Sequence, residues 1–229
     1  FLHLFTDGRD SSHHAAYGFV EELRKHFYGN ERIASIVGRF YAMDRTKNWK
    51  RTEKAYNIII SCTGNKVRGA RDAILQAYNR GETDEFVSPS VVCDKEKPIG
   101  RVNDNDAIVF FNLRSDRARQ LTKAFIQPDF EKTNHGTFKR KSRPKHIRFV
   151  AMTDFGPDLP HIITAFPSRD VKNSLTLELD GMKQLYIAEK EKFAHVTYFF
   201  NGGFADPVTG EHRIMVPSPD VISYDQTPA

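Results

Sequence analysis

Cysteine is scarce in this sequence of 229 residues. Only Cys62 and Cys93 occur, and their spacing matches no zinc or iron–sulfur motif. Such sparse use of cysteine is typical of proteins in a reducing compartment, so we expect a cytoplasmic location. Long apolar runs are also missing, since none approaches the ~20 residues that a membrane-spanning helix needs, and no secretory signal is evident. The sequence therefore argues against a disulfide-rich secreted protein and against a membrane protein.

Several common catalytic motifs are absent as well. The sequence has no Walker phosphate-binding loop, no G-x-G-x-x-G dinucleotide fingerprint and no G-x-S-x-G nucleophile elbow. Its histidine and acidic residues show no recognised metal-ligand spacing. The chain thus offers no evident nucleophile and no metal cage.

What the chain does have is a modest excess of positive charge and enough apolar residues for a core. It contains 34 Lys and Arg residues against 29 Asp and Glu, which gives a net charge of +5, and 39% of its residues are hydrophobic. This charge suits an anionic ligand without requiring nucleic acid. The length allows one large domain or two small ones.

Apolar strands alternate with amphipathic helices through the first two thirds of the chain. Short apolar runs predict strands, and apolar residues spaced three or four apart predict helices. Alternation of this kind favours βαβ units, so we predict an α/β fold with three layers, in which helices cover both faces of a mostly parallel sheet. The expected strands are residues 1–6, 33–37, 86–92, 106–112, 147–152, 185–188 and 195–200, and the expected helices are residues 15–27, 52–61, 70–80 and 117–125.

The end of the chain differs in composition from the rest. Residues 217–229 include Pro217, Pro219 and Pro228, and proline favours extended backbone. We therefore predict one domain over residues 1–216, followed by a linker over residues 217–229.

Arginines follow three of the predicted strands. In a parallel sheet the carboxyl ends of the strands share one edge, where ligands commonly bind. Guanidinium groups there can hold a phosphate or a carboxylate through paired hydrogen bonds, and densely packed arginines call for an anion. A loop rich in salt bridges would show the same residues, and the pattern alone favours neither interpretation. The residues are Arg9 and Asp10 after the first strand, Arg39 and Arg45 after the second, and Arg114 and Arg117 after the strand at 106–112.

Two carboxylates, Asp10 and Asp116, lie among these arginines in the sequence. Each could simply orient an arginine. One of them could instead move a proton, because a carboxylate among cations stays ionised and can accept one. The sequence leaves both roles open.

A basic run without any acidic residue covers residues 139–148. Such a run could contact nucleic acid, but no aromatic residues are interleaved for base stacking. We interpret it as a solvated loop that leads into the next strand, and we expect no nucleic-acid partner.

A series of ordered motifs resembles the cofactor-independent phosphoglycerate mutases. The motifs cover nearly the whole chain in the order of that family, which makes the resemblance specific. They are Asp7-Gly8-Arg9-Asp10, residues 38–45 with Trp49, residues 84–87 with Pro89-Ser90, residues 104–107, residues 111–117, residues 188–197, Asn201-Gly202-Gly203, and residues 217–219 followed by Tyr224-Asp225.

The resemblance implies an isomerase of glycolysis and gluconeogenesis that interconverts 3-phosphoglycerate and 2-phosphoglycerate through a phosphoserine. In that family a serine of an alkaline-phosphatase-like domain takes the phosphate with the help of two manganese ions and without 2,3-bisphosphoglycerate. An inserted α/β domain holds the glycerate meanwhile. The chain resembles this inserted domain. We therefore expect no metal site within it, the phosphatase domain of the same polypeptide as its partner, a monomeric protein, and no activity for the isolated chain.

The resemblance also implies roles for individual residues. Asp10 becomes the candidate acid/base, and together with Arg9 it is expected to contact the glycerate hydroxyls. The resemblance alone singles out Lys192, which by its spacing would be a solvated surface lysine. The alternative to this assignment is a stand-alone, non-catalytic anion-binding module. The further substrate contacts are expected from Arg39, Arg45, Arg114, Arg117 and Lys192.

Overall fold

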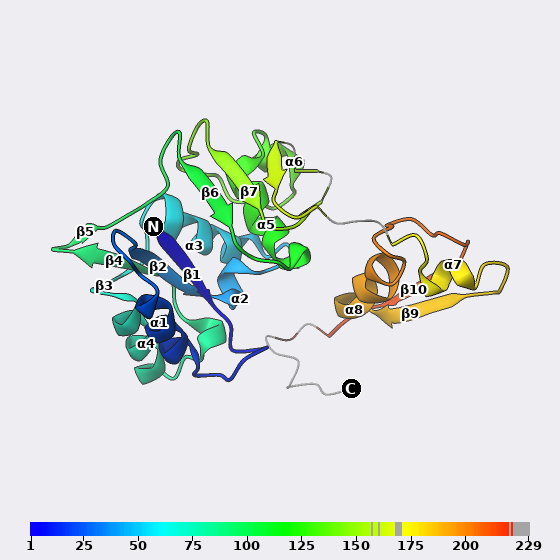
Figure 1. Cartoon of the computed structure of the whole chain (residues 1–229), viewed down its shortest axis with the longest axis horizontal. Coiled ribbons are helices and arrows are strands. Elements are labelled where there is room, and N and C mark those ends of the chain that lie inside the picture. The colour runs from blue at the N-terminus through cyan, green and yellow to red at the C-terminus, as the bar shows by residue number, and fades with distance from the viewer. Residues whose placement is uncertain (157, 160, 168–170, 220, 222–229) are drawn as a thin grey trace. The chain divides into compact units, whose positions relative to one another are not determined.

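The computed structural model describes residues 1–229 apart from 157, 160, 168–170, 220 and 222–229. The chain divides into two compact units, Phe1–Pro167 and Ser168–Ala229. Figure 1 shows the elements of both. Each unit is described by itself below. No described helix is long and apolar enough to cross a membrane.

The first unit contains a mixed sheet of five strands. β1 (Leu2–Thr6) pairs in parallel with β2 (Ile33–Gly38), and β2 pairs with β4 (Ser90–Asp94) in the antiparallel sense. β3 (Asn65–Val67) and β5 (Lys97–Pro98) complete the sheet on β4. Because β1 and β2 are parallel and in register up to their last residues, both strands end at the same edge.

Helices cover both faces of this sheet. α1 (Ala16–Lys25) and α4 (Ala70–Asn79) pack on one face, and α3 (Trp49–Ile60) packs on the other. Successive side chains of a strand point to opposite faces, so Ile36 of β2 joins the core under α1 and α4 while Val37 joins the core under α3. Every residue of β2 is buried, as expected for an interior strand covered on both sides.

A second sheet in the same unit consists of three parallel strands, β6 (Ala107–Phe110), β7 (Arg148–Ala151) and β8 (Ile162–Thr164). α5 (Ser115–Ile126) packs against α3, and its apolar face joins the same core as β6 and β7. The rings of Phe110 on β6 and Phe5 on β1 form an edge-to-face pair with a centroid distance of 5.8 Å. A continuous core therefore links the two sheets. The shorter elements of this unit are α2 (Arg39–Ala42), η1 (Asp84–Phe86) and α6 (Phe130–Thr133).

The predicted α/β class with largely parallel strands is confirmed, with two differences in this unit. The strand that precedes Arg114 is not part of the sheet that holds β1 and β2, so the assumption of one shared sheet was wrong. The strand predicted at 86–92 begins only at Ser90, because Pro89 has no N–H to give to a ladder and η1 occupies the preceding residues.

The second unit contains a small βαβ arrangement. β9 (Leu185–Glu189) pairs in parallel with β10 (His212–Val216), and α8 (Lys190–Ala194) continues into the π-helical turn η2 (His195–Phe199). α7 (Leu175–Glu178) precedes them. The strand predicted at 195–200 was therefore wrong. Parallel strands need a crossover between them, and this helical segment supplies it despite its β-branched and aromatic residues.

The units divide at residues 167 and 168, whereas the sequence led us to expect one domain up to residue 216. Of the linker predicted at 217–229, residues 220 and 222–229 lie outside the described part of the chain.

Candidate anion-binding site

The loop after β1 is a tight turn organised by Asp7. The Asp7 carboxylate accepts hydrogen bonds from the backbone N–H groups of Arg9 at 3.3 Å and Asp10 at 3.4 Å. Gly8 within the turn has a φ of +73°, and a Cβ there would lie only 2.6 Å from the backbone nitrogen of Glu85. Both the left-handed backbone and the close approach require glycine.

Arg39 begins α2 directly after β2 and is only 5% exposed. Its Nη1 donates to Asp10 Oδ2 at 2.8 Å and also to Asp7 Oδ1. Burial opposes the charge on Arg39, but the hydrogen bonds and charges of Asp10 and Asp7 outweigh it and raise the arginine pKa. In return the hydrogen bond and charge of Arg39 lower the pKa of the exposed Asp10 carboxyl, which is therefore ionised at neutral pH.

The loop that carries Arg45 is held by the buried carboxylate of Asp44. Asp44 accepts hydrogen bonds from Asn48 N at 3.0 Å, from Gln120 Nε2 at 2.8 Å and from Arg51 Nη1 at 3.2 Å. Gln120 belongs to α5, so Asp44 ties this loop to the helix that follows β6. A buried carboxylate with this many donors fixes the position from which Arg45 projects.

Asp116, in the first turn of α5, joins two of the arginines. It accepts from Arg114 Nε at 2.8 Å and from Arg45 Nη1. Burial would raise the pKa of Asp116, but the two guanidinium groups outweigh burial and lower it. Arg114 and Arg45, which are 69 positions apart in the sequence, thus share one carboxylate.

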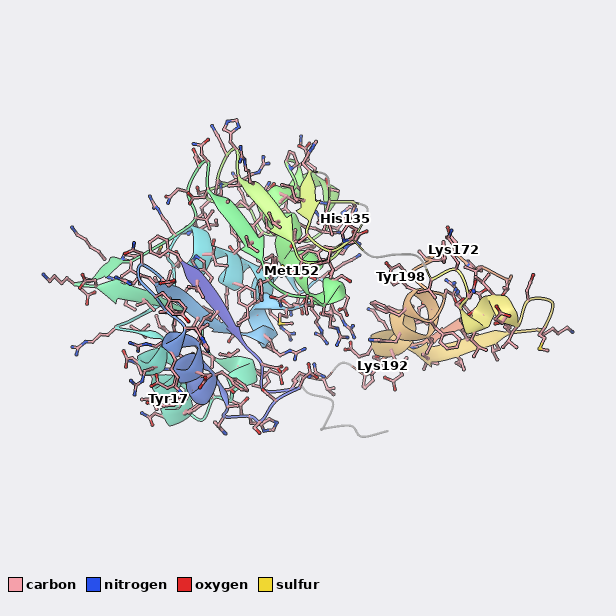
Figure 2. All side chains as sticks on the ribbon, viewed as in Figure 1. Tyr17, His135, Met152, Lys172, Lys192 and Tyr198 are labelled. Carbon is pink, nitrogen blue, oxygen red and sulfur yellow. The ribbon has the colours of Figure 1, made fainter. Side chains whose placement is uncertain are left out.

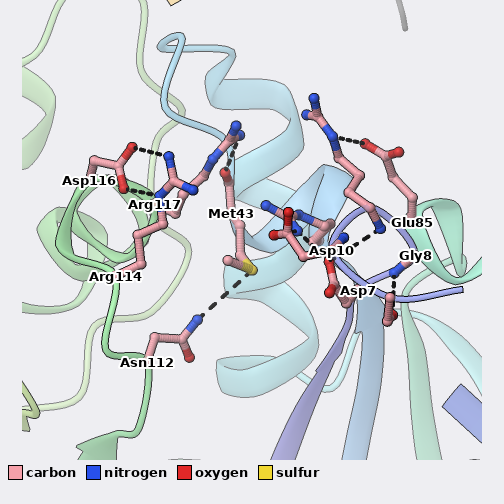
Figure 3. A network of polar contacts seen from close by, with 12 residues as sticks. Asp7, Gly8, Asp10, Met43, Glu85, Asn112, Arg114, Asp116 and Arg117 are labelled. Atoms are coloured by element: carbon pink, nitrogen blue, oxygen red, sulfur yellow. Dashed lines mark hydrogen bonds and ion pairs between the residues drawn. The ribbon is translucent and has the colours of Figure 1, made fainter. Parts of the chain in front are cut away.

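Arg117 lies one residue beyond Asp116 on the same helix and connects to the loop after α2. Its Nη1 donates to the backbone oxygen of Met43 at 3.3 Å. Asn112 also contacts Met43, through its Nδ2 at 3.8 Å from the sulfur. Figure 3 shows Asp116, Arg114 and Arg117 on one side of Met43, with Asp7, Asp10 and Glu85 on the other side.

The structure brings the three predicted loops together although they follow strands of two different sheets. The charge of Arg114 contributes to the lowered pKa of Asp10, and the charges of Arg9, Arg39 and Arg117 act on Glu85. The sequence led us to expect that such densely packed arginines need an anion, but carboxylates of the chain itself already lie among them. Among the described residues the cluster has five guanidinium groups and four carboxylates, which are Arg9, Arg39, Arg45, Arg114 and Arg117 with Asp7, Asp10, Glu85 and Asp116.

Sequence reasoning missed two acidic members of this cluster. Asp7 is part of the recognised Asp7-Gly8-Arg9-Asp10 turn, but nothing in the pattern marked it as the partner of an arginine 32 positions away. Glu85 also lies in a quoted motif without an assigned role, and its Oε1 is 4.0 Å from Arg9 Nε. Long-range ion pairs of this kind have no local sequence signal.

Lys192 belongs to the second unit, where it lies on α8 with an exposed side chain (Figure 2). It is therefore not among the clustered residues of the first unit, and its expected role stays a prediction.

The basic run at residues 139–148 is not simply a solvated loop. Arg140 is buried, and its guanidinium donates to the backbone oxygens of Ala124, Gln127 and Pro128 and to the carboxylate of Glu131, at distances of 2.9–3.1 Å. It thereby satisfies carbonyl groups at the C-terminal end of α5. At least this member of the run is structural, and the structure gives no support to nucleic-acid binding by it.

In the part of the chain that the structure describes, no group of three or more His, Cys, Asp or Glu side chains is placed to hold a metal ion. The first unit is therefore best described as an α/β domain that gathers arginines and carboxylates at its strand ends. Such a site can hold small molecules that carry phosphate or carboxylate groups.

Comparisons with known proteins narrow this class to a family. Residues 1–157 match the family model of the BPG-independent PGAM N-terminus, and residues 155–229 match the metalloenzyme superfamily. The chain is 48% identical over its full length to the 2,3-bisphosphoglycerate-independent phosphoglycerate mutase of Methanococcoides burtonii, and 44% identical to phosphoglycerate mutase 1 of the same type from Methanosarcina acetivorans. It covers 44% of the length of each relative.

A solved structure of Leishmania mexicana phosphoglycerate mutase at low cobalt concentration resembles the chain with a TM-score of 0.78 and 28% sequence identity. The match covers 97% of this chain and 42% of the other. The chain belongs to the BPG-independent phosphoglycerate mutases, and it comprises their N-terminal region together with part of the metalloenzyme domain.

Proposed function

We propose that the polypeptide containing this chain interconverts 3-phosphoglycerate and 2-phosphoglycerate without 2,3-bisphosphoglycerate, and that the arginine cluster of the first unit holds the substrate. The observation that carries the proposal is the convergence of the loops after β1, β2 and β6. Arg39, bonded to Asp10 at 2.8 Å, and Arg114, bonded to Asp116 at 2.8 Å, are fixed members of that cluster. Family membership supports the same conclusion.

Phosphoglycerate carries a phosphate and a carboxylate, and both groups suit guanidinium forks. Arg114 and Arg117 project from the start of α5, where backbone N–H groups also favour an anion. We assign the phosphate and carboxylate contacts to these two arginines together with Arg45. Arg9 and Asp10, on the loop after β1, would contact the glycerate hydroxyls.

The chemistry of Asp10 supports one of its two open roles over the other. Arg39 lowers the pKa of this carboxyl, and a carboxylate with a lowered pKa is a weak base. Such a group accepts a hydrogen bond from a hydroxyl well but abstracts its proton poorly. We therefore propose that Asp10 orients the glycerate rather than serving as the main proton acceptor.

We further propose a division of roles along the chain. Residues 1–167 would hold the glycerate, and residues 168–229 would belong to the metal-binding domain, since the metalloenzyme match begins at residue 155 and the compact units divide at 167 and 168. The sequence had led us to expect the corresponding boundary at residue 216. The phosphoserine and two manganese ions would lie in other parts of the polypeptide. The match to two successive family models disfavours a stand-alone anion-binding module. The monomeric state and cytoplasmic location stay predictions.

The test is an enolase-coupled assay of the complete polypeptide with 3-phosphoglycerate. The proposal expects turnover that is independent of added 2,3-bisphosphoglycerate and abolished by a chelator. Activity that appears only after 2,3-bisphosphoglycerate is added would contradict it.

A further inference from the structure

We propose that Glu85 is a positioning residue of the site and that it acts through Arg9. This inference rests on the proposed function, and it adds a carboxylate to which the family resemblance gave no role. The segment Asp84–Val87, which carries Glu85, crosses the ends of β1 and β2.

The backbone of this segment lies directly against two strand-end glycines. A Cβ at Gly8 would meet Glu85 N at 2.6 Å, and a Cβ at Gly38 would collide with Glu85 O. Thr6 Oγ1 donates to Asp84 O at 2.6 Å, and Gly38 N donates to Val87 O at 2.8 Å. These contacts all use backbone atoms of the segment, so they hold Glu85 in place whatever its side chain is.

The neighbouring Asp84 fixes the segment further. Its carboxylate accepts from Ala15 N at 2.8 Å and from Ala16 N at 2.7 Å, which are the first N–H groups of α1, and it also accepts from Tyr78 OH. Asp84 is therefore a structural residue that satisfies the start of a helix. Glu85 is the next residue, and its side chain serves a different purpose.

The Glu85 side chain points to the arginine cluster, as Figure 3 shows. Its exposed fraction is 17%, and its Oε1 is 4.0 Å from Arg9 Nε. Burial raises the pKa of Glu85, while the charges of Arg9, Arg39 and Arg117 oppose that shift. Burial prevails and the pKa of Glu85 is raised overall, so the facing cations offset only part of the cost of taking this carboxylate out of water.

The geometry explains what Glu85 does for Arg9. Arg9 is 38% exposed, on a loop whose turn is fixed by Asp7 but whose long side chain has freedom of its own. The Glu85 carboxylate approaches the Nε edge of the guanidinium. A contact at this edge does not use the two terminal nitrogens, which can then meet a glycerate oxygen as a fork. Glu85 thus reduces the number of orientations that Arg9 must give up when substrate binds.

The test is a double-mutant cycle in the complete polypeptide, using Arg9→Ala, Glu85→Ala and the combination, with 3-phosphoglycerate as substrate. We expect Glu85→Ala to lower kcat/KM by about tenfold, mainly through KM, since a group held throughout the reaction contributes uniform binding. Glu85→Gln keeps the shape of the side chain and one acceptor oxygen, so we expect its kcat/KM to fall less than that of Glu85→Ala. The double variant should be no worse than Arg9→Ala alone, because Arg9 is the arginine whose guanidinium Glu85 contacts, at 4.0 Å.

Glu22→Ala is the matched control. Glu22 is an exposed glutamate on α1 that pairs with Lys25 at 2.7 Å, and none of its described contacts reaches the arginine cluster. Its kcat/KM should stay within about twofold of wild type. Equal thermal midpoints for Glu85→Ala and Glu85→Gln would show that their kinetic difference does not arise from unfolding.

The outcomes separate the inference from the proposed function. If wild type is active but Glu85→Ala matches it, or if the losses of the two single variants multiply in the double variant, the positioning role is overturned and the proposed function stands. If wild type does not interconvert the phosphoglycerates, the proposed function fails and this inference fails with it.

Discussion

Replacing Arg140 should destabilise the first unit far more than replacing its neighbour Arg143. The Arg140 side chain is 5% exposed, and all five N–H donors of its guanidinium have acceptors, two of them from the Glu131 carboxylate and three from backbone oxygens. Arg140→Met keeps most of the apolar stem but leaves these oxygens without the cation. Breaking a fully buried ion pair typically costs ~3–5 kcal/mol, and because the Glu131 side chain is 38% exposed we expect a smaller loss of about 2–3 kcal/mol.

Arg143→Met is the matched control, because the exposed Arg143 donates, among the described residues, one hydrogen bond of 3.2 Å to the backbone oxygen of Ile126. Loss of one exposed hydrogen bond should cost less than ~1 kcal/mol. The thermal midpoint shifts by ~2–4 °C for each kcal/mol lost, so Arg140→Met should lower the midpoint of the first unit by ~4–12 °C. The assay is thermal unfolding followed by circular dichroism at pH 7.

The pH dependence provides a second check on Arg140. The hydrogen bonds that Arg140 donates lower the pKa of Glu131 from 4.5 to about 2. A carboxyl with a lowered folded-state pKa contributes stability above its unfolded pKa and loses that contribution as the pH falls, here between 4.5 and about 2. Arg140→Met should flatten this part of the stability curve. Equal midpoints for Arg140→Met and Arg143→Met at pH 7 would refute the idea that Arg140 clamps the end of α5.

Three further outcomes are expected. Lys192→Ala should lower turnover of the complete polypeptide while leaving 3-phosphoglycerate binding to this 229-residue chain unchanged by calorimetry, and lost binding would contradict a role that depends on domain closure. The 229-residue chain alone should show no mutase activity in the coupled assay, so sustained turnover would refute the division of roles. Burial lowers the pKa of His3 from 6.5 to about 4, so wild-type stability should fall as the pH drops from 6.5 towards 4, and His3→Gln should weaken that dependence in urea titrations.

The alternation of strands and helices was predictable because each element has a local signal. β2 is an apolar run broken only by Ser35 that ends in Gly38, and α3 and α4 show clear helical spacing. Membership of a particular sheet has no such signal, and for that reason β6 was assigned to the wrong one. The residues at 195–199 have the composition of a strand, but their place between two parallel strands makes them helical.

The arginines of the candidate site could be predicted from the sequence, but the carboxylates that pair with them could not. Arginines at strand ends can be read from the chain in order, and the resemblance gave each of them a role. The pairing of Arg39 with Asp7, or of Arg9 with Glu85, depends on loops that meet only in the folded unit. The burial of Arg140 was hidden for the same reason, because a basic run looks alike whether it is solvated or packed against the end of a helix.

The most direct test of the central claim is kcat/KM for 3-phosphoglycerate of Arg117→Ala in the complete polypeptide, measured beside Arg143→Ala. Arg117 belongs to the cluster, and Arg143 is an arginine of the same unit that contacts only the end of α5 in the described bonds. Loss of one bidentate charged contact costs ~2–4 kcal/mol in the transition state, so Arg117→Ala should lose at least about tenfold in kcat/KM with its fold intact. Arg143→Ala should remain near wild type. A near-normal kcat/KM for Arg117→Ala would contradict the assignment of the arginine cluster as the phosphoglycerate site.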